Sequence, residues 1–156
     1  MNSMENKHKS SSHVQQQAED VLFDKLKELL NVEVEKNPKI LLSNQGLTYI
    51  RPDFYSAEHC VVGEIFAHIG KPKKAQDNKI ANDILKMLLL EKVKGKQHRK
   101  IIVVCDDTEK KTLEGKSALA ESIRQFGVKI MHIKIDSEMQ KQILQAQARQ
   151  KMTNAE

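Results

Sequence analysis

The spacing of apolar residues along the chain predicts several helices. Between Val14 and Asn31 the apolar residues recur at steps of three and four, which is the spacing of one helical face. The same periodicity predicts helices from about Ala75 to Val93, from about Leu113 to Phe126, and after Ser137. A glycine follows the second and the third of these segments, as expected for left-handed C-caps. The apolar stripe after Ser137 soon fades, so we expect a final helix that frays.

Short runs with strand character separate these helices. They are residues 39–42, 47–50, 58–69, 100–105 and 128–135. The first three runs are joined by short turns and can form an antiparallel meander, whereas the last two are reached through helices and require near-parallel pairing. Lys129 and Lys134 must reach water, which predicts the last strand near a sheet edge. We therefore predict an α/β fold with a mixed five-stranded sheet flanked by helices.

The length and composition fit one domain with tails. The chain has 156 residues, and residues 1–13 are polar enough to predict a disordered leader. We expect a single domain over residues 14–136, followed by a C-terminal helix or fraying tail over residues 137–156. No apolar run approaches the roughly 20 residues that span a bilayer. Cys60 and Cys105 lie in apolar runs, so we expect buried thiols and a cytoplasmic protein.

Positive charge favours an anionic partner. Lys and Arg number 26 against 21 Asp and Glu, which gives a formal net charge of +5. Basic residues outnumber acids most strongly over residues 71–100. This bias is typical of a footprint on a phosphate backbone, and a merely solubilising surface is the alternative. Only 4% of the residues are aromatic, which argues against extensive base stacking.

Two acids carry the most informative chemistry. Asp53 follows Pro52 at the end of one predicted strand, and Glu64 lies within the next. In a meander these carboxylates can face each other and form an oxygen-rich site for Mg²⁺ or Mn²⁺. A turn role for Asp53 and a structural salt bridge for Glu64 are the plainer alternatives.

The element order and these acids resemble the PD-(D/E)xK nuclease superfamily, whose core is a helix, three strands, a helix and a strand. The resemblance covers residues 14–135 by element order, with a further helix, strand and C-terminal helix completing the chain. It implies that Asp53 and Glu64 bind the catalytic metal ion, joined by Glu19 on the first helix. The motif lysine is missing, because Phe66 occupies its position. Lys79 on the next helix is the expected substitute, with Gln76 as its polar neighbour.

The sequence thus predicts a Mg²⁺- or Mn²⁺-dependent nuclease that acts on DNA rather than RNA. Four lysines are expected to bind the nucleic acid, namely Lys71, Lys73, Lys74 and Lys86. Phe66 motivates an alternative, which is an inactive nuclease-like module for nucleic-acid binding or assembly. A third hypothesis is a protein-binding regulator that forms homo-oligomers through its Gln-rich C-terminal helix.

Three other features receive a structural interpretation. His68 shares the strand face of Glu64 and could contact a substrate, although a half-buried strand-end histidine is the plainer reading. Asp106 and Asp107 offer a rival metal site, but acids at that place are typical helix caps. The sequence contains no Gly-rich phosphate loop, zinc-type Cys/His spacing or nucleophile elbow, so kinase, dinucleotide-binding and serine-hydrolase functions have no support.

Overall fold

The computed structural model describes the backbone of residues 3–43 and 45–155, and the side chains of residues 12–43 and 45–152. The helices are α1 (Ser3–Leu30), α2 (Lys74–Lys94), α3 (Asp107–Leu113), α4 (Ala118–Gln125) and α5 (Ser137–Ala155). The strands are β1 (Glu35–Lys36), β2 (Ile40–Leu41), β3 (Tyr49–Ile50), β4 (Phe54–Ser56), β5 (Val61–Phe66), β6 (Arg99–Val104) and β7 (Val128–His132).

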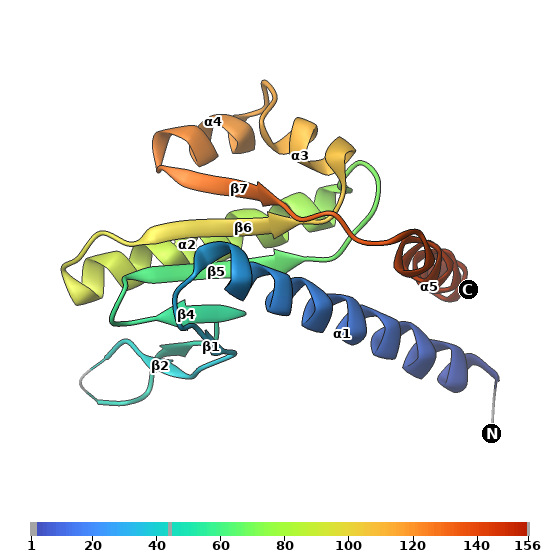
Figure 1. Cartoon of the computed structure of the whole chain (residues 1–156), viewed down its shortest axis with the longest axis horizontal. Coiled ribbons are helices and arrows are strands. Elements are labelled where there is room, and N and C mark those ends of the chain that lie inside the picture. Colours follow the sequence, from blue (N-terminus) through green and yellow to red (C-terminus); the bar gives the residue numbers. More distant parts are fainter. Residues whose placement is uncertain (1–2, 44, 156) are drawn as a thin grey trace.

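A mixed five-stranded sheet forms the centre of the molecule, which confirms the predicted α/β class (Figure 1). Its strand order is β1-β4-β5-β6-β7. The β1–β4 and β4–β5 pairs are antiparallel, and β5–β6 and β6–β7 are parallel because helices connect them. β7 lies at the edge, as predicted. β2 and β3 form a separate two-stranded sheet.

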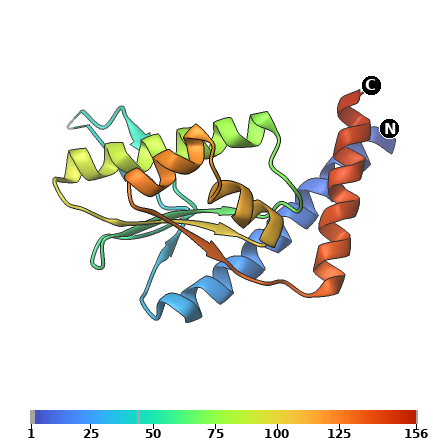
Figure 2. The ribbon, with the colours of Figure 1, turned by 90° about the horizontal axis from the view of Figure 1, so that it is seen from above.

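Helices cover both faces of the sheet (Figure 2). α1 packs on one face, where Leu22 and Leu26 are fully buried, and α5 joins the same core through Ile143. α2, α3 and α4 cover the opposite face. The alternation along β5 decides which side chains meet which helices: Val61 and Ile65 face α1, whereas Val62 packs in the core below α2.

The meander differs from the one predicted. The run 47–50 does not pair with β5, because the hairpin of β2 and β3 forms its own small sheet. β4 takes that place beside β5, and β1 is the outer strand. Pro52 cannot donate to a ladder, so the chain leaves the hairpin there and starts a new strand at Phe54. Asp53 therefore precedes a strand rather than ending one.

Two helix boundaries also differ from the prediction. The segment 113–126 is not one helix: α3 ends at Leu113, and α4 starts after Ser117, whose hydroxyl accepts a hydrogen bond from the Ala120 amide. Serine is a favoured N-cap residue, so a new helix starts after Ser117 and the predicted helix is divided into two. α1 begins at Ser3 rather than near Val14, so helical backbone extends through most of the polar leader. α5 runs to Ala155 despite its weak apolar stripe.

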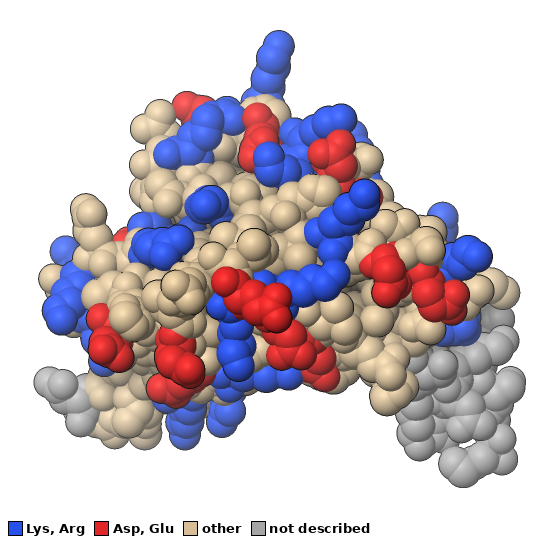
Figure 3. Space-filling model, viewed as in Figure 1, with Lys and Arg blue, Asp and Glu red and all other residues tan. Residues whose placement is uncertain are grey.

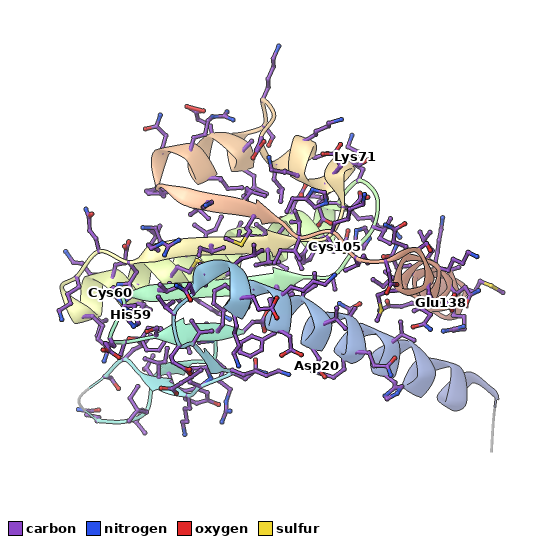
Figure 4. All side chains as sticks on the ribbon, in the orientation of Figure 1. Asp20, His59, Cys60, Lys71, Cys105 and Glu138 are labelled. Carbon is purple, nitrogen blue, oxygen red and sulfur yellow. The ribbon has the colours of Figure 1, made fainter. Side chains whose placement is uncertain are left out.

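The two cysteines are free, and Figure 4 places them at opposite ends of the sheet. Within the described residues, no helix combines the length and the apolar character needed to cross a bilayer.

Candidate functional site

Asp53 and Glu64 lie opposite each other on neighbouring strands. The β4–β5 register pairs Phe54 with Gly63, so Asp53, one residue earlier, faces Glu64. The Ile65 amide donates a hydrogen bond to Asp53 Oδ2 over 2.7 Å, which fixes the Asp53 carboxylate against β5. Both side chains line the same hollow. The structure thus brings together the two acids that the sequence singled out.

This hollow, which we call the acidic pocket, has a volume of about 230 Å³. The residues around it are Ile50, Arg51, Pro52, Asp53, Val62, Glu64, Lys79, Asp83, Lys86 and Met87. α2 supplies Lys79, Asp83 and Lys86 from one helical face, because their spacing is four and three residues. Lys79 Nζ lies 3.0 Å from Asp83 Oδ2, so the lysine is paired within its own helix at the pocket wall.

Burial and neighbouring acids shift the pKa values in the acidic pocket. The pKa of Glu64 lies well above its usual range, because its carboxyl is desolvated and stands beside Asp53, with Asp83 adding to the effect. The pKa of Lys79 is raised as well: desolvation lowers it, but the hydrogen bond and the charge of Asp83, together with the charges of Glu64 and Asp53, outweigh that effect. Lys79 is therefore a permanent cation near neutral pH.

Glu19 reaches the same acids from the other side of β5. It lines a small hollow together with Asp53 and Ile65, and Gln15 Nε2 donates to its Oε1 over 3.3 Å. Burial raises the pKa of Glu19, and Asp53 contributes to the rise. α1 therefore places a third carboxyl within electrostatic reach of the pair.

The acid pair suits a hard divalent cation. Two adjacent carboxyls that repel each other hold a proton more tightly, and a cation relieves this repulsion by replacing the proton. Mg²⁺ in proteins is often held by one or two carboxylates together with water and substrate phosphate. Among the side chains that the structure describes, no group of three or more His, Cys, Asp or Glu is arranged to hold a metal ion. In the acidic pocket, the two carboxyls available to a cation across β4 and β5 are those of Asp53 and Glu64.

A larger hollow of about 420 Å³ adjoins the acidic pocket, and Lys79 lines both. We call it the glutamine groove, since five of its residues are Gln15, Gln16, Gln76, Gln147 and Gln150. α1 and α5, whose ribbons are seen in Figure 2, supply residues to two of its walls. Gln147 fixes α5 there: its Oε1 accepts from the Ile69 amide over 2.9 Å, and its Nε2 donates to the Ile69 carbonyl over 3.1 Å.

Gln76 differs from its expected role beside Lys79. Its Oε1 accepts a hydrogen bond from the Lys73 amide over 2.7 Å, which caps the first turn of α2. Its side chain still lines the glutamine groove. The structure therefore brings Gln76 to the groove and not to the acidic pocket.

The lysines predicted to bind nucleic acid divide between two places. Lys86 lines the acidic pocket, and Lys71 and Lys73 line a hollow of about 490 Å³ against α5. Figure 4 shows Lys71 at the end of the sheet where β5 and β6 terminate. Lys74 starts α2 and is exposed. On the face shown in Figure 3, acidic and basic side chains are interspersed, so positive charge does not form one continuous surface there.

Asp106 is the N-cap of α3, as the capping interpretation predicted. Its Oδ2 accepts from the Glu109 amide and from the Gly70 amide, at 3.4 Å and 3.0 Å. Asp107 pairs with Lys111 on the helix surface. These acids hold the loop after β5 to the start of α3.

Sequence reasoning missed two acids. Asp83 was not among the predicted site residues, although it is buried and is the partner of Lys79. Glu109 is fully buried, but in the sequence it is one of several acids at a helix start. Its depth follows from the packing of α3 on the sheet, and no local pattern indicates it.

Comparison with family models, with curated proteins and with solved structures finds no match to this chain.

Proposed function

We propose that this protein is a nuclease of the PD-(D/E)xK type, which hydrolyses phosphodiester bonds in DNA with the help of Mg²⁺ or Mn²⁺. The observation that carries the proposal is the pairing of Asp53 with Glu64 across β4 and β5, with Lys79 on the wall of the same pocket. The element order of the chain, from α1 through β6, supports it. Two free cysteines favour a cytoplasmic location.

Each residue has a distinct part in the proposed reaction. Asp53 and Glu64 hold the cation, which when bound polarises a phosphoryl oxygen and lowers the pKa of a coordinated water. Glu19 adds negative charge from α1. Lys79 keeps its proton and orients the attacking water, since an ammonium whose pKa is raised is a hydrogen-bond donor rather than a base. Lys71, Lys73, Lys74 and Lys86 attract the phosphate backbone.

A second candidate is a nuclease-like module that binds nucleic acid without cutting it. The observation that favours it is the ion pair between Lys79 and Asp83, whose atoms lie 3.0 Å apart. Lys79 is the expected substitute for the missing motif lysine, and this ion pair already engages its ammonium group. In this case the basic residues bind the nucleic acid, and the acids of the acidic pocket take no part in a reaction. Both candidates predict DNA binding, so cleavage separates them.

The deciding experiment is a plasmid-cleavage assay with the full chain in Mn²⁺, in Mg²⁺ and in EDTA. We expect cleavage only with a divalent cation, and a loss of at least about 100-fold in Asp53→Asn and Glu64→Gln, because each change removes a charge from the cation site. Both substitutions keep the shape of the side chain. Asp107→Asn is the matched control, because it removes an exposed carboxylate outside the pocket.

Equal cleavage by Asp53→Asn, Glu64→Gln and the control would overturn the nuclease assignment. DNA binding without cleavage in the unaltered chain would support the second candidate. Lys79→Met then tests the role of the lysine: a nuclease loses turnover while DNA affinity changes little.

A further inference from the structure

His68 and Glu109 form a pair outside the acidic pocket. His68 follows the end of β5, and Glu109 lies in α3, which packs on the same face of the sheet. His68 Nδ1 lies 3.9 Å from Glu109 Oε2. Among the described residues, neither Nδ1 nor either Glu109 oxygen has a hydrogen-bond partner. These two buried groups lie just beyond hydrogen-bond distance, so a small approach of the side chains would let a proton pass between them.

The opposite side of His68 faces open space. Its side chain lines the glutamine groove and also the hollow that contains Lys71 and Lys73. Its own exposed fraction is 13%, whereas that of Glu109 is 0%. The imidazole thus lies between a buried carboxyl and two hollows, of which one is lined by Lys79 and the other by Lys71 and Lys73.

The loop around His68 is held in place. The Cys105 thiol donates to the His68 carbonyl over 3.5 Å, and Asp106 accepts from the Gly70 amide over 3.0 Å. The Phe66 ring lies 5.9 Å from the imidazole, centroid to centroid. These contacts fix the position of the histidine before any ligand arrives.

We propose that His68 and Glu109 act as a proton-sharing pair that binds a phosphate oxygen of the nucleic acid at the glutamine groove. In the free protein Glu109 is a neutral acid that faces Nδ1 across 3.9 Å without a hydrogen bond, and His68 carries its proton on Nε2. When a phosphate oxygen accepts from Nε2, the proton of Glu109 moves to Nδ1. The histidine becomes an imidazolium, the glutamate becomes a carboxylate, and the pair remains neutral overall.

The surroundings of the pair favour the neutral form of both groups in the free protein. Burial, together with Asp106 and Asp77, raises the pKa of Glu109 to about 9. Burial and Lys73 lower the pKa of His68, while Asp106 and the Gly70 backbone oppose that shift. Cys105 is close as well, and burial with Glu109 and Asp106 raises the pKa of its thiol to about 12, so it stays neutral. An arriving phosphate adds negative charge beside His68, which favours the imidazolium.

This inference rests on the proposed function for the identity of its ligand, and its test does not depend on cleavage. The imidazole nitrogen signals of His68 in the ¹⁵N-labelled full chain are recorded at pH 7 in EDTA. A short DNA duplex is added in one arm and inorganic phosphate in the other, and His68→Gln assigns the signals. We expect the duplex to convert His68 to the imidazolium form at concentrations where inorganic phosphate has no effect.

Glu109→Gln distinguishes this role from a structural one. The glutamine amide has the same shape and still presents a donor towards Nδ1, but it has no acidic proton to transfer. We expect His68 to stay neutral with DNA in this variant and the DNA affinity to fall about tenfold, as for loss of a charged hydrogen bond. Glu138→Gln, an exposed change on α5, is the control and should behave as the unaltered chain (Figure 4).

A His68 that remains neutral with saturating DNA would overturn the pair, as would a Glu109→Gln variant with unchanged affinity. A response to inorganic phosphate with none to the duplex would overturn its assignment to nucleic acid. If the pair responds to DNA and the chain cuts nothing in Mn²⁺, the pair stands and the nuclease proposal fails.

Discussion

Gly63 shows how one residue controls the position of the acid pair. It lies in β5 next to Glu64, opposite Phe54 of β4. A methyl group there would overlap the Phe54 ring and would come within 2.6 Å of the Ile101 carbonyl oxygen. The absence of a side chain lets β4, β5 and β6 approach closely, which keeps Asp53 and Glu64 together.

We predict that Gly63→Ala lowers the free energy of unfolding by about 1–3 kcal/mol, because the added methyl forces apart a packed core. Urea denaturation measures this change. Phe54→Leu in the same chain removes one of the two clashes and should restore part of the loss. A Gly63→Ala variant as stable as the parent would show that the sheet can widen without cost.

Glu109 gives a pH dependence with a definite sign. Burial raises its pKa in the folded chain to about 9, above the ordinary value of 4.5, so the folded state binds the proton more tightly than the unfolded state. The contribution of Glu109 to stability is complete below the unfolded pKa and is lost as the pH rises towards 9. Glu109→Gln cannot ionise and does not lose stability in this way.

The stability of Glu109→Gln relative to the parent should therefore increase with pH between about 5 and 9, by at most about 1.4 kcal/mol per pH unit. Urea denaturation in EDTA at several pH values measures this difference. Glu64 titrates in both proteins and cancels from the comparison. A difference that does not change with pH would mean that Glu109 ionises as an ordinary acid.

At the scale of the element, one side chain of α5, that of Gln147, attaches this helix to the loop after β5 beside the glutamine groove. The Gln147 amide satisfies both backbone groups of Ile69, in the loop after β5. Ile143, one turn earlier in α5, lies in the core that this helix shares with α1. Gln147 therefore decides how firmly α5 closes the glutamine groove.

We expect Gln147→Ala to lower the free energy of unfolding by about 1–2 kcal/mol, since two hydrogen bonds are lost. Amide hydrogen exchange in the loop after β5 and in the second half of α5 should rise more than exchange in β6. Gln145→Ala, at an exposed position of the same helix, is the matched control. Similar exchange in the two variants would contradict the docking role of Gln147.

The elements themselves show what the sequence could predict. The boundaries of α2 and of the buried strand β6 were close to the prediction, because each has a clear apolar pattern. In addition, Lys73-Lys74 and Gly95 mark the two ends of α2. β1 and β4 were missed, because two- and three-residue strands have too few positions for a periodicity. The acid pair was foreseen from residue types, whereas the burial of Glu109 depends on tertiary packing.

For the whole molecule, the arrangement of charge matters more than its sum. A net charge of +5 attracts anions in general, but acids are interspersed with bases on the face in Figure 3. Lys71, Lys73 and Lys86 stand at hollows near the candidate site, whereas Lys92, Lys94 and Lys96 are exposed near the far end of α2. Each group consists of three lysines, so the two groups have equal charge and differ only in their position relative to the candidate site.

Replacing Lys71, Lys73 and Lys86 with Gln should reduce the salt dependence of DNA binding, lowering the slope of log K against log salt by about 3, or about one for each phosphate contact. Replacing Lys92, Lys94 and Lys96 with Gln changes the net charge equally and should leave the slope nearly unchanged. Fluorescence anisotropy between 50 and 300 mM salt, on the order of the range in which such slopes are resolved, measures both. Equal slopes in the two variants would show that overall charge, rather than a local footprint, governs binding.

The order of the elements along the chain has a consequence for protein synthesis. β4 and β5 leave the ribosome before β6, β7 and α5, so the two carboxylates can meet while the later elements are still being synthesised. α5, which closes one side of the groove, emerges last. A nascent chain therefore gains its acids before α5 can cover that side of the groove, and under the proposed function this delay would separate the formation of the cation site from the enclosure of a substrate.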